Sequence, residues 1–390
     1  MVDTFIKELN IKKNLFDPFC GSGTTLLSSR FNNLNSFGID INPLSVLVSK
    51  AENTYYGKNE INLFSEVIYR IKNFNKTSEI FHTNFELSDK VFNDEILQVL
   101  LQLKNYIKHI DNEKIRDLVF LAWLAIIEDV SNIKKEGNGI KYKNRKRTAN
   151  GYLNIKKSDW EKHNFPENKY QFVVDRLTRH LNLILTDLKT NYGLINKIPE
   201  IFHGDSLNFD KYLDSEIELT FFSPPYCNCF DYFEIHKVEL WLGDFVKNKN
   251  EFKKLRNMGF RSNTNALLQK PIHYNNTTLE KLISLFDVNK LWHKRIPGVV
   301  RGYFDDFHYF LTKLYLKTKT NGYVGIVVGN SAYTGVVIPT DLIISEIASE
   351  IGFNVKNIFV TRHLTTSSQQ KKQLESLKEY LRESIILLQK

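Results

Sequence analysis

The chain has 390 residues, 42% of them hydrophobic, which is enough for two or three domains with buried cores. Its 53 Lys and Arg residues against 44 Asp and Glu residues give a formal net charge of +9, which favours a polyanionic partner. Its three cysteines form no CxxC pair and no even disulfide framework, which argues against a zinc knuckle and a secreted disulfide scaffold.

Charge alone is weak evidence for a partner, because a bias toward Lys, Asn and Ile also arises from genome base composition. The longest apolar run, LVFLAWLAII at residues 118–127, is far shorter than the roughly 18 residues of a membrane span. The N-terminal stretch MVDTFIKELN lacks the apolar core of a signal peptide. We therefore expect a cytoplasmic protein without a membrane partner.

The N-terminal residues predict the first β-α-β unit of an open α/β sheet. Residues 14–18, NLFDP, are typical of a short buried strand, and the glycine-rich FCGSGTT that follows leads into a helical pattern. A second strand is expected at residues 36–40, SFGID.

Residues 60–200 predict long helices without a convincing strand. The four helical patterns are INLFSEVIYRIKNF, DEILQVLLQLKNYIKHI, EKIRDLVFLAWLAIIEDV and YQFVVDRLTRHLNLILTDLK. Between the last two lie residues 138–157, NGIKYKNRKRTANGYLNIKK, with seven Lys or Arg residues, two Tyr residues and no acidic residue. We expect these residues to form a mobile basic loop.

Strand patterns then return until the end of the chain. The segments are residues 201–206, 217–225, 323–331, 355–362 and 383–390. A helix is expected before the last two, with Thr340 or Asp341 as its N-terminal cap and Gly352 as its end. The chain therefore predicts an α/β fold with a seven-stranded sheet that a helical insertion interrupts.

The stretch DPFCGSGTT is typical of a ligand-binding turn between a strand and a helix. Gly21 and Gly23 permit a sharp turn and a close approach of the backbone to a ligand. Asp40 lies 19 residues beyond Gly21, at the expected tip of the next strand, where a carboxylate can accept both hydroxyl groups of a ribose. Asp17 suits a ligand with an ammonium or sulfonium group, such as S-adenosylmethionine. The alternative is a structural turn followed by an exposed acidic residue.

The motifs DPFCGSGTT and SPPY together resemble the amino-group DNA methyltransferases, which use S-adenosylmethionine, and SPPY is similar to the cytosine-N4 subset. The resemblance covers residues 1–50 and 200–390. It implies the class I methyltransferase fold, a Rossmann-like sheet that is mostly parallel.

The resemblance also implies a set of cofactor-binding residues. Asp17, Phe19, Gly21 and Gly23 would surround the methionine part of the cofactor. Asp40 would hold the ribose and Asp205 would reach the adenine amino group, although an ordinary turn aspartate is the alternative for Asp205. The remaining predicted cofactor-binding residues are Pro18, Cys20 and Thr24. No metal site is predicted.

The SPPY corner suits chemistry on an exocyclic amine, whose lone pair is delocalised into the base. The Ser223 hydroxyl and the Pro224 carbonyl can each accept one N–H, which draws the lone pair out of conjugation. Pro224 and Pro225 restrict the backbone there, and Tyr226 would stack on a base flipped from the duplex. The alternative is a rigid turn with a buried tyrosine.

Other polar residues receive no firm catalytic role. Cytosine-C5 methylation would need a Pro-Cys step, but Tyr226 follows Pro225, so Cys227 and Cys229 are expected to be packing residues. His236 is expected to be a satisfied polar residue on a helix behind the site. Asn330 and Ser331 end a strand at the same edge of the sheet, as a substrate contact or as a helix cap.

Double-stranded DNA is the expected partner. In the helical insertion, KYKNRKR at residues 141–147 with Tyr142 and Tyr152 could clamp phosphates, or could be an ordinary solvated face. The loop-rich residues 246–300, with KKLR, RSNTN and WHKR, form a second candidate recognition region. The expected domains are residues 1–55, 201–245 and 301–390 as the catalytic domain, 56–200 as the insertion and 246–300 as the recognition region.

The stretch that precedes DPFCGSGTT is shorter than the family pattern. Members usually carry a further motif there, whereas only MVDTFIKELNIKKN is present, with Val2, Phe5, Ile6 and Leu9 on one helical face. Two interpretations remain: a shortened enzyme, or a chain that needs a partner polypeptide to supply the missing motif.

The sequence thus predicts a cytosine-N4 DNA methyltransferase, as the modification enzyme of a restriction-modification system. Three alternatives stay open. They are an adenine-N6 DNA methyltransferase, a non-catalytic DNA-binding or partner subunit, and an RNA or protein amino-methyltransferase.

Overall fold

The computed structural model describes residues 1–137, 139–148, 151–190, 197–266, 271–365 and 374–390. The chain forms two compact units. Unit 1 comprises Met1–Asn53, Asn196–Asp231 and Lys253–Lys390, and unit 2 comprises Thr54–Ile195 and Tyr232–Phe252.

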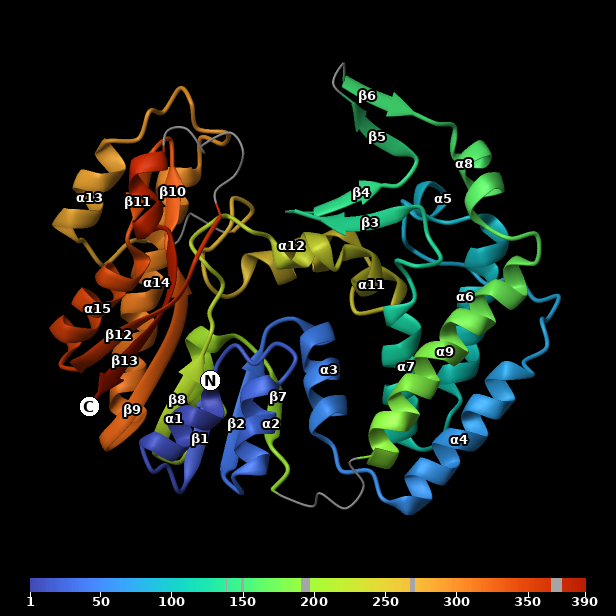
Figure 1. Cartoon of the computed structure of the whole chain (residues 1–390), viewed down its shortest axis with the longest axis horizontal. Helices are drawn as coiled ribbons and strands as arrows, with labels where there is room; N and C mark the ends of the chain where they lie inside the picture. The colour runs from blue at the N-terminus through green and yellow to red at the C-terminus, as the bar shows by residue number, and fades with distance from the viewer. Residues whose placement is uncertain (138, 149–150, 191–196, 267–270, 366–373) are drawn as a thin grey trace. The chain divides into compact units, whose positions relative to one another are not determined.

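Unit 1 is built around a seven-stranded sheet with the order β12-β13-β9-β8-β1-β2-β7 (Figure 1). Its strands are β1 (Asn14–Asp17), β2 (Asn35–Asp40), β7 (Glu200–His203), β8 (Ile217–Phe222), β9 (Thr318–Gly329), β12 (Asn354–His363) and β13 (Arg382–Gln389). All neighbours pair in parallel except β13, which runs antiparallel to both β9 and β12. The prediction of a mostly parallel, seven-stranded sheet is confirmed.

The chain reverses its direction across the sheet between β1 and β8. From β1 it proceeds through β2 to β7 on one side, whereas β8 is followed by β9 on the other side. In open α/β sheets the loops at the carboxyl ends of the strands diverge at such a reversal and leave a crevice for a ligand. The strand order therefore directs attention to the residues after β1 and β8.

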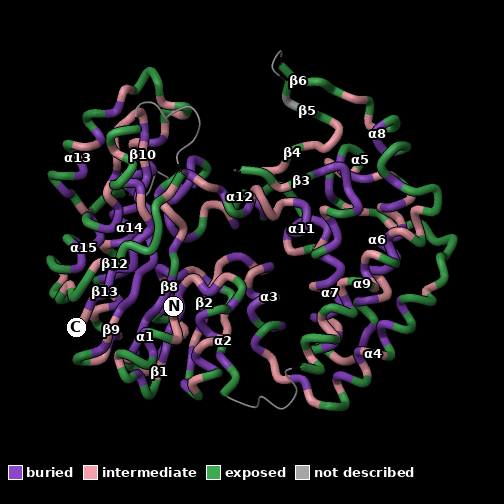
Figure 2. Tube along the Cα trace, in the orientation of Figure 1, coloured by how far each residue is buried: buried purple, intermediate pink, exposed green. Residues whose placement is uncertain are grey.

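Alternating strand residues bury both faces of the sheet. Phe16 and Phe222 join a core cluster with residues of α14 (Ile296–Lys317) and α15 (Thr340–Ile351). Leu15 and Phe221 join a second cluster with Phe5, Ile6 and Leu26, which come from α1 (Val2–Glu8) and α2 (Thr24–Phe31). Because side chains alternate across a strand, helices can cover both faces. Figure 2 shows the central strands as mostly buried.

The remaining elements of unit 1 are short. They are α3 (Pro43–Asn53), η1 (Ser206–Lys211), α13 (Thr277–Ser284), β10 (Ser331–Tyr333), β11 (Val336–Ile338) and η2 (Glu375–Tyr380). Helix α12 (Lys249–Asn257) contains the boundary between the two units.

The cap of α15 differs from the prediction. Neither Thr340 nor Asp341 occupies the N-cap position, which is held by Pro339, although the Asp341 carboxylate accepts the Leu342 N–H at 2.9 Å. Instead the Asn330 amide oxygen accepts the Asp341 N–H at 3.1 Å, and the buried Asp341 carboxylate accepts from Arg382 at 2.9 Å. Asn330 thus serves the start of a helix, which was the alternative to a substrate contact. The predicted end is confirmed, since Gly352 takes a left-handed φ of 115°.

Unit 2 is mainly helical, as the periodic pattern predicts. Its helices are α4 (Lys58–Lys72), α5 (Ser88–Val91), α6 (Asp94–Lys108), α7 (Glu113–Ala125), α8 (Lys157–Asn164), α9 (Lys169–Thr190), α10 (Tyr232–Ile235) and α11 (Lys237–Leu242). Trp123 is fully buried, and its indole N–H donates to the Leu100 carbonyl at 3.0 Å. In the part of the chain that the structure describes, no helix is both long and apolar enough to cross a membrane.

The predicted mobile basic loop is wrong, because most of it forms two antiparallel hairpins. Strand β3 (Ile133–Glu136) pairs with β4 (Gly139–Tyr142), and β5 (Arg145–Thr148) pairs with β6 (Gly151–Asn154). Asn144 joins the hairpins: its amide donates to the Ile155 carbonyl at 2.7 Å, and its N–H donates to Asn132 at 3.0 Å. Charged residues at successive positions of β3 and β5 hid the strand periodicity. Residues 138, 149 and 150 of that loop lie outside the described residues.

Candidate cofactor and substrate site

The turn after β1 depends on its two glycines. Gly21 and Gly23 have φ angles of 52° and 85°, which L-residues with side chains rarely adopt. A Cβ on Gly23 would lie 2.4 Å from the Ser49 hydroxyl and 2.5 Å from the Asn53 amide nitrogen, both on α3. Gly23 therefore permits close packing as well as the turn. Around Gly21, the nearest atom to such a Cβ would be the Phe19 carbonyl oxygen at 3.9 Å, so this turn leaves open space.

Asp40, at the tip of β2, holds the glycine turn in place. One carboxylate oxygen accepts the Gly21 N–H at 2.9 Å and the other accepts the Asn42 N–H at 2.8 Å. Burial raises the pKa of Asp40, while these two N–H groups lower it. Each carboxylate oxygen can accept a further hydrogen bond, so the side chain keeps acceptors for a ligand.

Asp17, at the tip of β1, is a buried carboxyl group with only 3% of its surface exposed. It accepts the Phe19 N–H at 3.0 Å. Burial raises its pKa to about 7; the Thr25 hydroxyl and the Phe19 N–H lower it, and the charge of Asp40 raises it further. Ionised Asp17 and Asp40 repel each other, and a positively charged ligand group beside them would relieve this repulsion.

Asp17→Asn is expected to stabilise the ligand-free protein, and more so at pH 8 than at pH 5.5. The unfolded carboxyl titrates near 3.8 and the folded one near 7, so the folded state binds the proton more tightly. Proton binding to Asp17 therefore stabilises the folded protein at low pH, and this stabilisation is lost as the pH rises from about 4 to 7. At 1.36 kcal/mol per pH unit, the loss amounts to at most about 4 kcal/mol. Thermal unfolding at both pH values measures the effect, with exposed Asp214→Asn as the control. An equal gain in Tm at both pH values would contradict the assignment.

Four strand tips meet around this turn. The Gly204 N–H, after β7, donates to the Asp40 carbonyl at 3.0 Å, and the Ser206 hydroxyl donates to the carbonyl of buried Pro18. Phe222, the last residue of β8, stacks on Phe19 with ring centroids 5.5 Å apart. The tips of β1, β2, β7 and β8 thus lie side by side, although residues far apart in the sequence form them.

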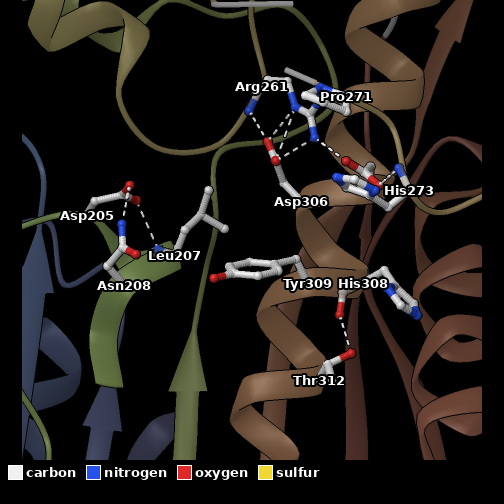
Figure 3. Close-up of a pocket in the computed structure, with 11 residues that line it drawn as sticks. Asp205, Leu207, Asn208, Arg261, Pro271, His273, Asp306, His308, Tyr309 and Thr312 are labelled. Atoms are coloured by element: carbon white, nitrogen blue, oxygen red, sulfur yellow. Dashed lines mark hydrogen bonds and ion pairs between the residues drawn. The ribbon is translucent and has the colours of Figure 1, made fainter. Parts of the chain in front are cut away.

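Asp205 sits at the start of η1 and shows the contacts of an ordinary turn aspartate. Its carboxylate accepts the Leu207 N–H at 3.0 Å and the Asn208 side-chain amide at 3.1 Å. It is half-buried and lines a cavity of about 520 Å³. Figure 3 shows Asp205 and Asn208 on one side of this cavity, with Tyr309 of α14 pointing toward them from the other side.

Arg261 also lines this cavity, and its side chain is held by ion pairs within unit 1. Its guanidinium donates to both Asp305 and Asp306, and only 3% of its surface is exposed. Most of the RSNTN segment is likewise buried, since Ser262, Asn263 and Thr264 are each less than a tenth exposed. This part of the predicted recognition region is therefore inside the fold.

The SPPY corner follows β8 directly. Ser223 is exposed, Pro224 is buried, and Pro225 and Tyr226 are partly buried. The hydroxyl of Ser223 can therefore reach a substrate. Its position beside the Phe19–Phe222 ring stack brings the SPPY corner next to the glycine turn.

Tyr226 is held by residues that the sequence did not single out. Its hydroxyl donates to Glu383 of β13 at 2.9 Å, and a Cβ on Gly329 of β9 would lie 2.9 Å from its ring. Glu383 also accepts from Arg362 at 2.7 Å. Burial raises the pKa of Glu383, but Arg362 and Tyr226 lower it more. The only sequence signal was a lone acidic residue in the apolar strand RESIILLQ.

The other predicted cofactor-site residues divide into buried and exposed positions. Cys20 is buried with a pKa well above its usual range, and burial is the main cause. Thr24 is exposed and is the first residue of α2.

The cysteines after SPPY are packing residues, as predicted. Cys227 is fully buried, which raises the pKa of its thiol, and burial raises the pKa of Cys229 to about 11. All three cysteines are free. Among the described residues, no group of three His, Cys, Asp or Glu side chains could hold a metal ion.

The prediction for His236 is wrong in two respects. It separates two short helices, α10 and α11, which belong to unit 2. Within the described residues its buried Nδ1 atom has no hydrogen-bond partner. Burial, together with the charge of Lys135, lowers its pKa to about 4, so the ring is neutral at pH 7.

Comparison with known proteins finds relatives that share most of this chain's length. It is 26% identical to the Type II methyltransferase M.BsoBI of Geobacillus stearothermophilus over 95% of this chain and 79% of that protein. It is 25% identical to the Type II methyltransferase M.AvaI of a Nostoc species, over 89% of this chain and 74% of that protein. It is 26% identical to the Type II methyltransferase M.MvaI of Kocuria varians, over 89% of this chain and 76% of that protein. No family model matches the chain. These relatives support the methyltransferase resemblance that the two motifs carry.

Proposed function

We propose that this chain is an S-adenosylmethionine-dependent DNA methyltransferase that methylates the exocyclic N4 of cytosine, as the modification enzyme of a restriction-modification system. The observation that carries the proposal is the meeting of the glycine turn, Asp17, Asp40 and the SPPY corner at the reversal of one sheet. A mostly parallel, seven-stranded sheet supports the class I methyltransferase fold, and the relatives are Type II methyltransferases.

The residues at the tips of β1 and β2 fit the cofactor. Asp17 is a buried carboxyl group beside a second carboxylate, an arrangement that a cationic ligand group would stabilise. Asp40 keeps acceptor capacity for the ribose hydroxyls, and the turn at Gly21 is open to a close ligand. When bound, S-adenosylmethionine supplies an electrophilic methyl group on a sulfonium.

The SPPY corner would prepare the amine of the target base. The exposed Ser223 hydroxyl and the Pro224 carbonyl each accept one N–H of the amine, which makes the nitrogen pyramidal and aims its lone pair. Tyr226, fixed by Glu383 and Gly329, would pack on a base that has left the duplex. Ser at the first motif position favours cytosine, and adenine N6 is the alternative target.

Mass analysis of nucleosides from DNA of expressing cells tests this proposal. N4-methylcytosine should rise above the empty-vector level, whereas a rise in N6-methyladenine would transfer the proposal to adenine. Sequencing that detects modified bases then gives the recognition site. If neither modified base appears and calorimetry detects no binding of S-adenosylmethionine, the chain is a non-catalytic subunit instead. Binding without methylation would indicate a need for a partner polypeptide or a different substrate, which competition between duplex DNA and transfer RNA would reveal.

Glu383 is expected to act as a positioning residue for Tyr226. Glu383→Ala removes the acceptor of the Tyr226 hydroxyl and should lower kcat about 10-fold, because a misplaced stacking partner weakens alignment of the base. Affinity for S-adenosylmethionine should not change. Glu383→Gln keeps an acceptor oxygen and should restore most of the rate. If Glu383 had a purely structural role, Tm would fall in both variants, and kcat would not fall while the affinity for S-adenosylmethionine stayed unchanged.

A further inference from the structure

The two hairpins of unit 2 form a basic concave surface. We call strands β3, β4, β5 and β6 the basic ribbon. Its side chains line a hollow of about 970 Å³. Among the lining residues, one is acidic, Glu136, and five are basic: Lys134, Lys141, Lys143, Arg145 and Lys146. Within unit 2, the β5–β6 hairpin extends beyond β3 and β4 (Figure 1).

The cations of the basic ribbon differ in how far they are already engaged. Lys134 and Lys141 share the Glu136 carboxylate, which leaves a net positive charge on that pair of strands. Lys143 points inward and donates to the carbonyls of Glu128 at 2.6 Å and Ser131 at 2.9 Å. Within the described residues, neither Arg145 nor Lys146 forms an ion pair. These two cations are therefore available to a partner.

One face of the β5–β6 hairpin combines groups that suit base edges. Arg145 pairs in register with Asn154, so their side chains share a face, and Tyr152, two residues before Asn154, shares it too. The Arg145 guanidinium lies over the Tyr142 ring at 5.2 Å, which orients it, and Tyr152 is 70% exposed. Hydrogen bonds of Lys143 and Asn144 fix the two residues that precede β5.

Two arginines of the second candidate recognition region are already paired, whereas its Lys253, Lys254 and Lys294 are exposed. Arg256 pairs with Asp231, and Arg261 pairs with Asp305 and Asp306. These cations already have carboxylate partners within unit 1. A polyanion that bound these two arginines would have to break their ion pairs, whereas Arg145 and Lys146 of the basic ribbon have no ion pair to lose within the described residues.

We propose that the β5–β6 hairpin enters the major groove of duplex DNA and reads base edges with Arg145 and Asn154, while Lys146 contacts a phosphate. A two-stranded ribbon fits the major groove, which is about 12 Å wide. Arginine suits the O6 and N7 acceptors of guanine, and asparagine suits adenine. This inference rests on the proposed DNA methyltransferase function and names the element that selects the site.

Fluorescence anisotropy with the full chain and labelled duplexes tests the proposal. Arg145→Ala is expected to weaken binding to the recognition duplex about 10-fold or more and to reduce discrimination against a scrambled duplex. Lys146→Ala should weaken binding to both duplexes alike and lower the slope of log K against log salt by about 1. Lys72→Ala, an exposed change on α4, is the matched control and should have no effect.

Two further measurements keep the test decisive. In the wild-type protein, DNA should slow amide hydrogen exchange in β5 and β6, which needs no variant. A-form duplex RNA should bind more weakly than DNA, because its major groove is too narrow for the hairpin; equal binding of RNA would overturn groove entry.

Different results would contradict the role of the basic ribbon and the proposed methyltransferase function. If Arg145→Ala and Lys146→Ala bind DNA as tightly and as selectively as the wild type while cofactor binding and methylation persist, the basic ribbon is not the recognition element. If cofactor binding and methylation are absent, the enzymatic proposal fails, and anisotropy with mixed-sequence duplexes still decides whether the basic ribbon binds DNA.

Discussion

Ser223→Ala is expected to slow methyl transfer by about 10²–10³-fold, the usual loss when one preorganised hydrogen-bonding group is removed from a reacting centre. The exposed Ser223 hydroxyl would accept one N–H of the target amine, and the Pro224 carbonyl alone would leave the lone pair less well aligned. Affinity for S-adenosylmethionine should stay within about 2-fold, because the lost interaction matters mainly in the transition state. Single-turnover transfer of a labelled methyl group to duplex DNA measures the rate.

Cys227→Ala is the matched control for Ser223→Ala. Cys227 lies in the same loop, but it is fully buried and burial raises the pKa of its thiol, so it offers no thiolate for attack on a base. Its removal should lower stability by about 1 kcal/mol and leave the rate of methyl transfer nearly unchanged. Wild-type activity in Ser223→Ala would remove the proposed mechanism, and loss of activity in Cys227→Ala would point to C5 chemistry instead.

Asp40→Asn is expected to weaken S-adenosylmethionine binding about 100-fold. Two hydrogen bonds from ribose hydroxyls to a carboxylate are involved, and hydrogen bonds to charged groups contribute about 1.5–3 kcal/mol each. The change also places an amide NH₂ against the N–H of Gly21 or Asn42, which loosens the glycine turn. Titration calorimetry at pH 8 measures the affinity, and thermal unfolding checks that the variant is folded.

Asp205→Asn separates the ribose contact from the adenine contact. Asp205 would accept one N–H of the adenine amino group, so its loss should weaken cofactor binding only about 10-fold. It also caps η1, where an asparagine can replace it at little cost. An affinity loss in Asp205→Asn that equals the loss in Asp40→Asn would contradict the separate roles. Unchanged affinity in Asp40→Asn would remove the ribose assignment altogether.

The sequence was least informative where tertiary contacts replace local signals. Thr340 and Asp341 look like helix caps, yet Asn330 from β9's end supplies the acceptor, and Asp341 instead binds Arg382 of β13. In the basic ribbon, successive charged residues in β3 and β5 leave too few apolar residues at alternate positions, so hydrophobic periodicity could not reveal the strands. Hydrogen bonds through Asn132 and Asn144 fix the hairpins, and these depend on positions brought together by folding.

By itself the sequence determined the strands of the seven-stranded sheet, the main helices and the glycines of the turn, because strand burial, helical spacing and positive φ angles are local requirements that leave a residue pattern. It also carried the two motifs on which the methyltransferase proposal depends. Only the tertiary structure decided that the tips of β1, β2, β7 and β8 meet, that Asp17 is a buried carboxyl with a raised pKa, and that Glu383 fixes Tyr226. Burial and long-range pairing depend on which distant segments become neighbours, and no local pattern encodes that.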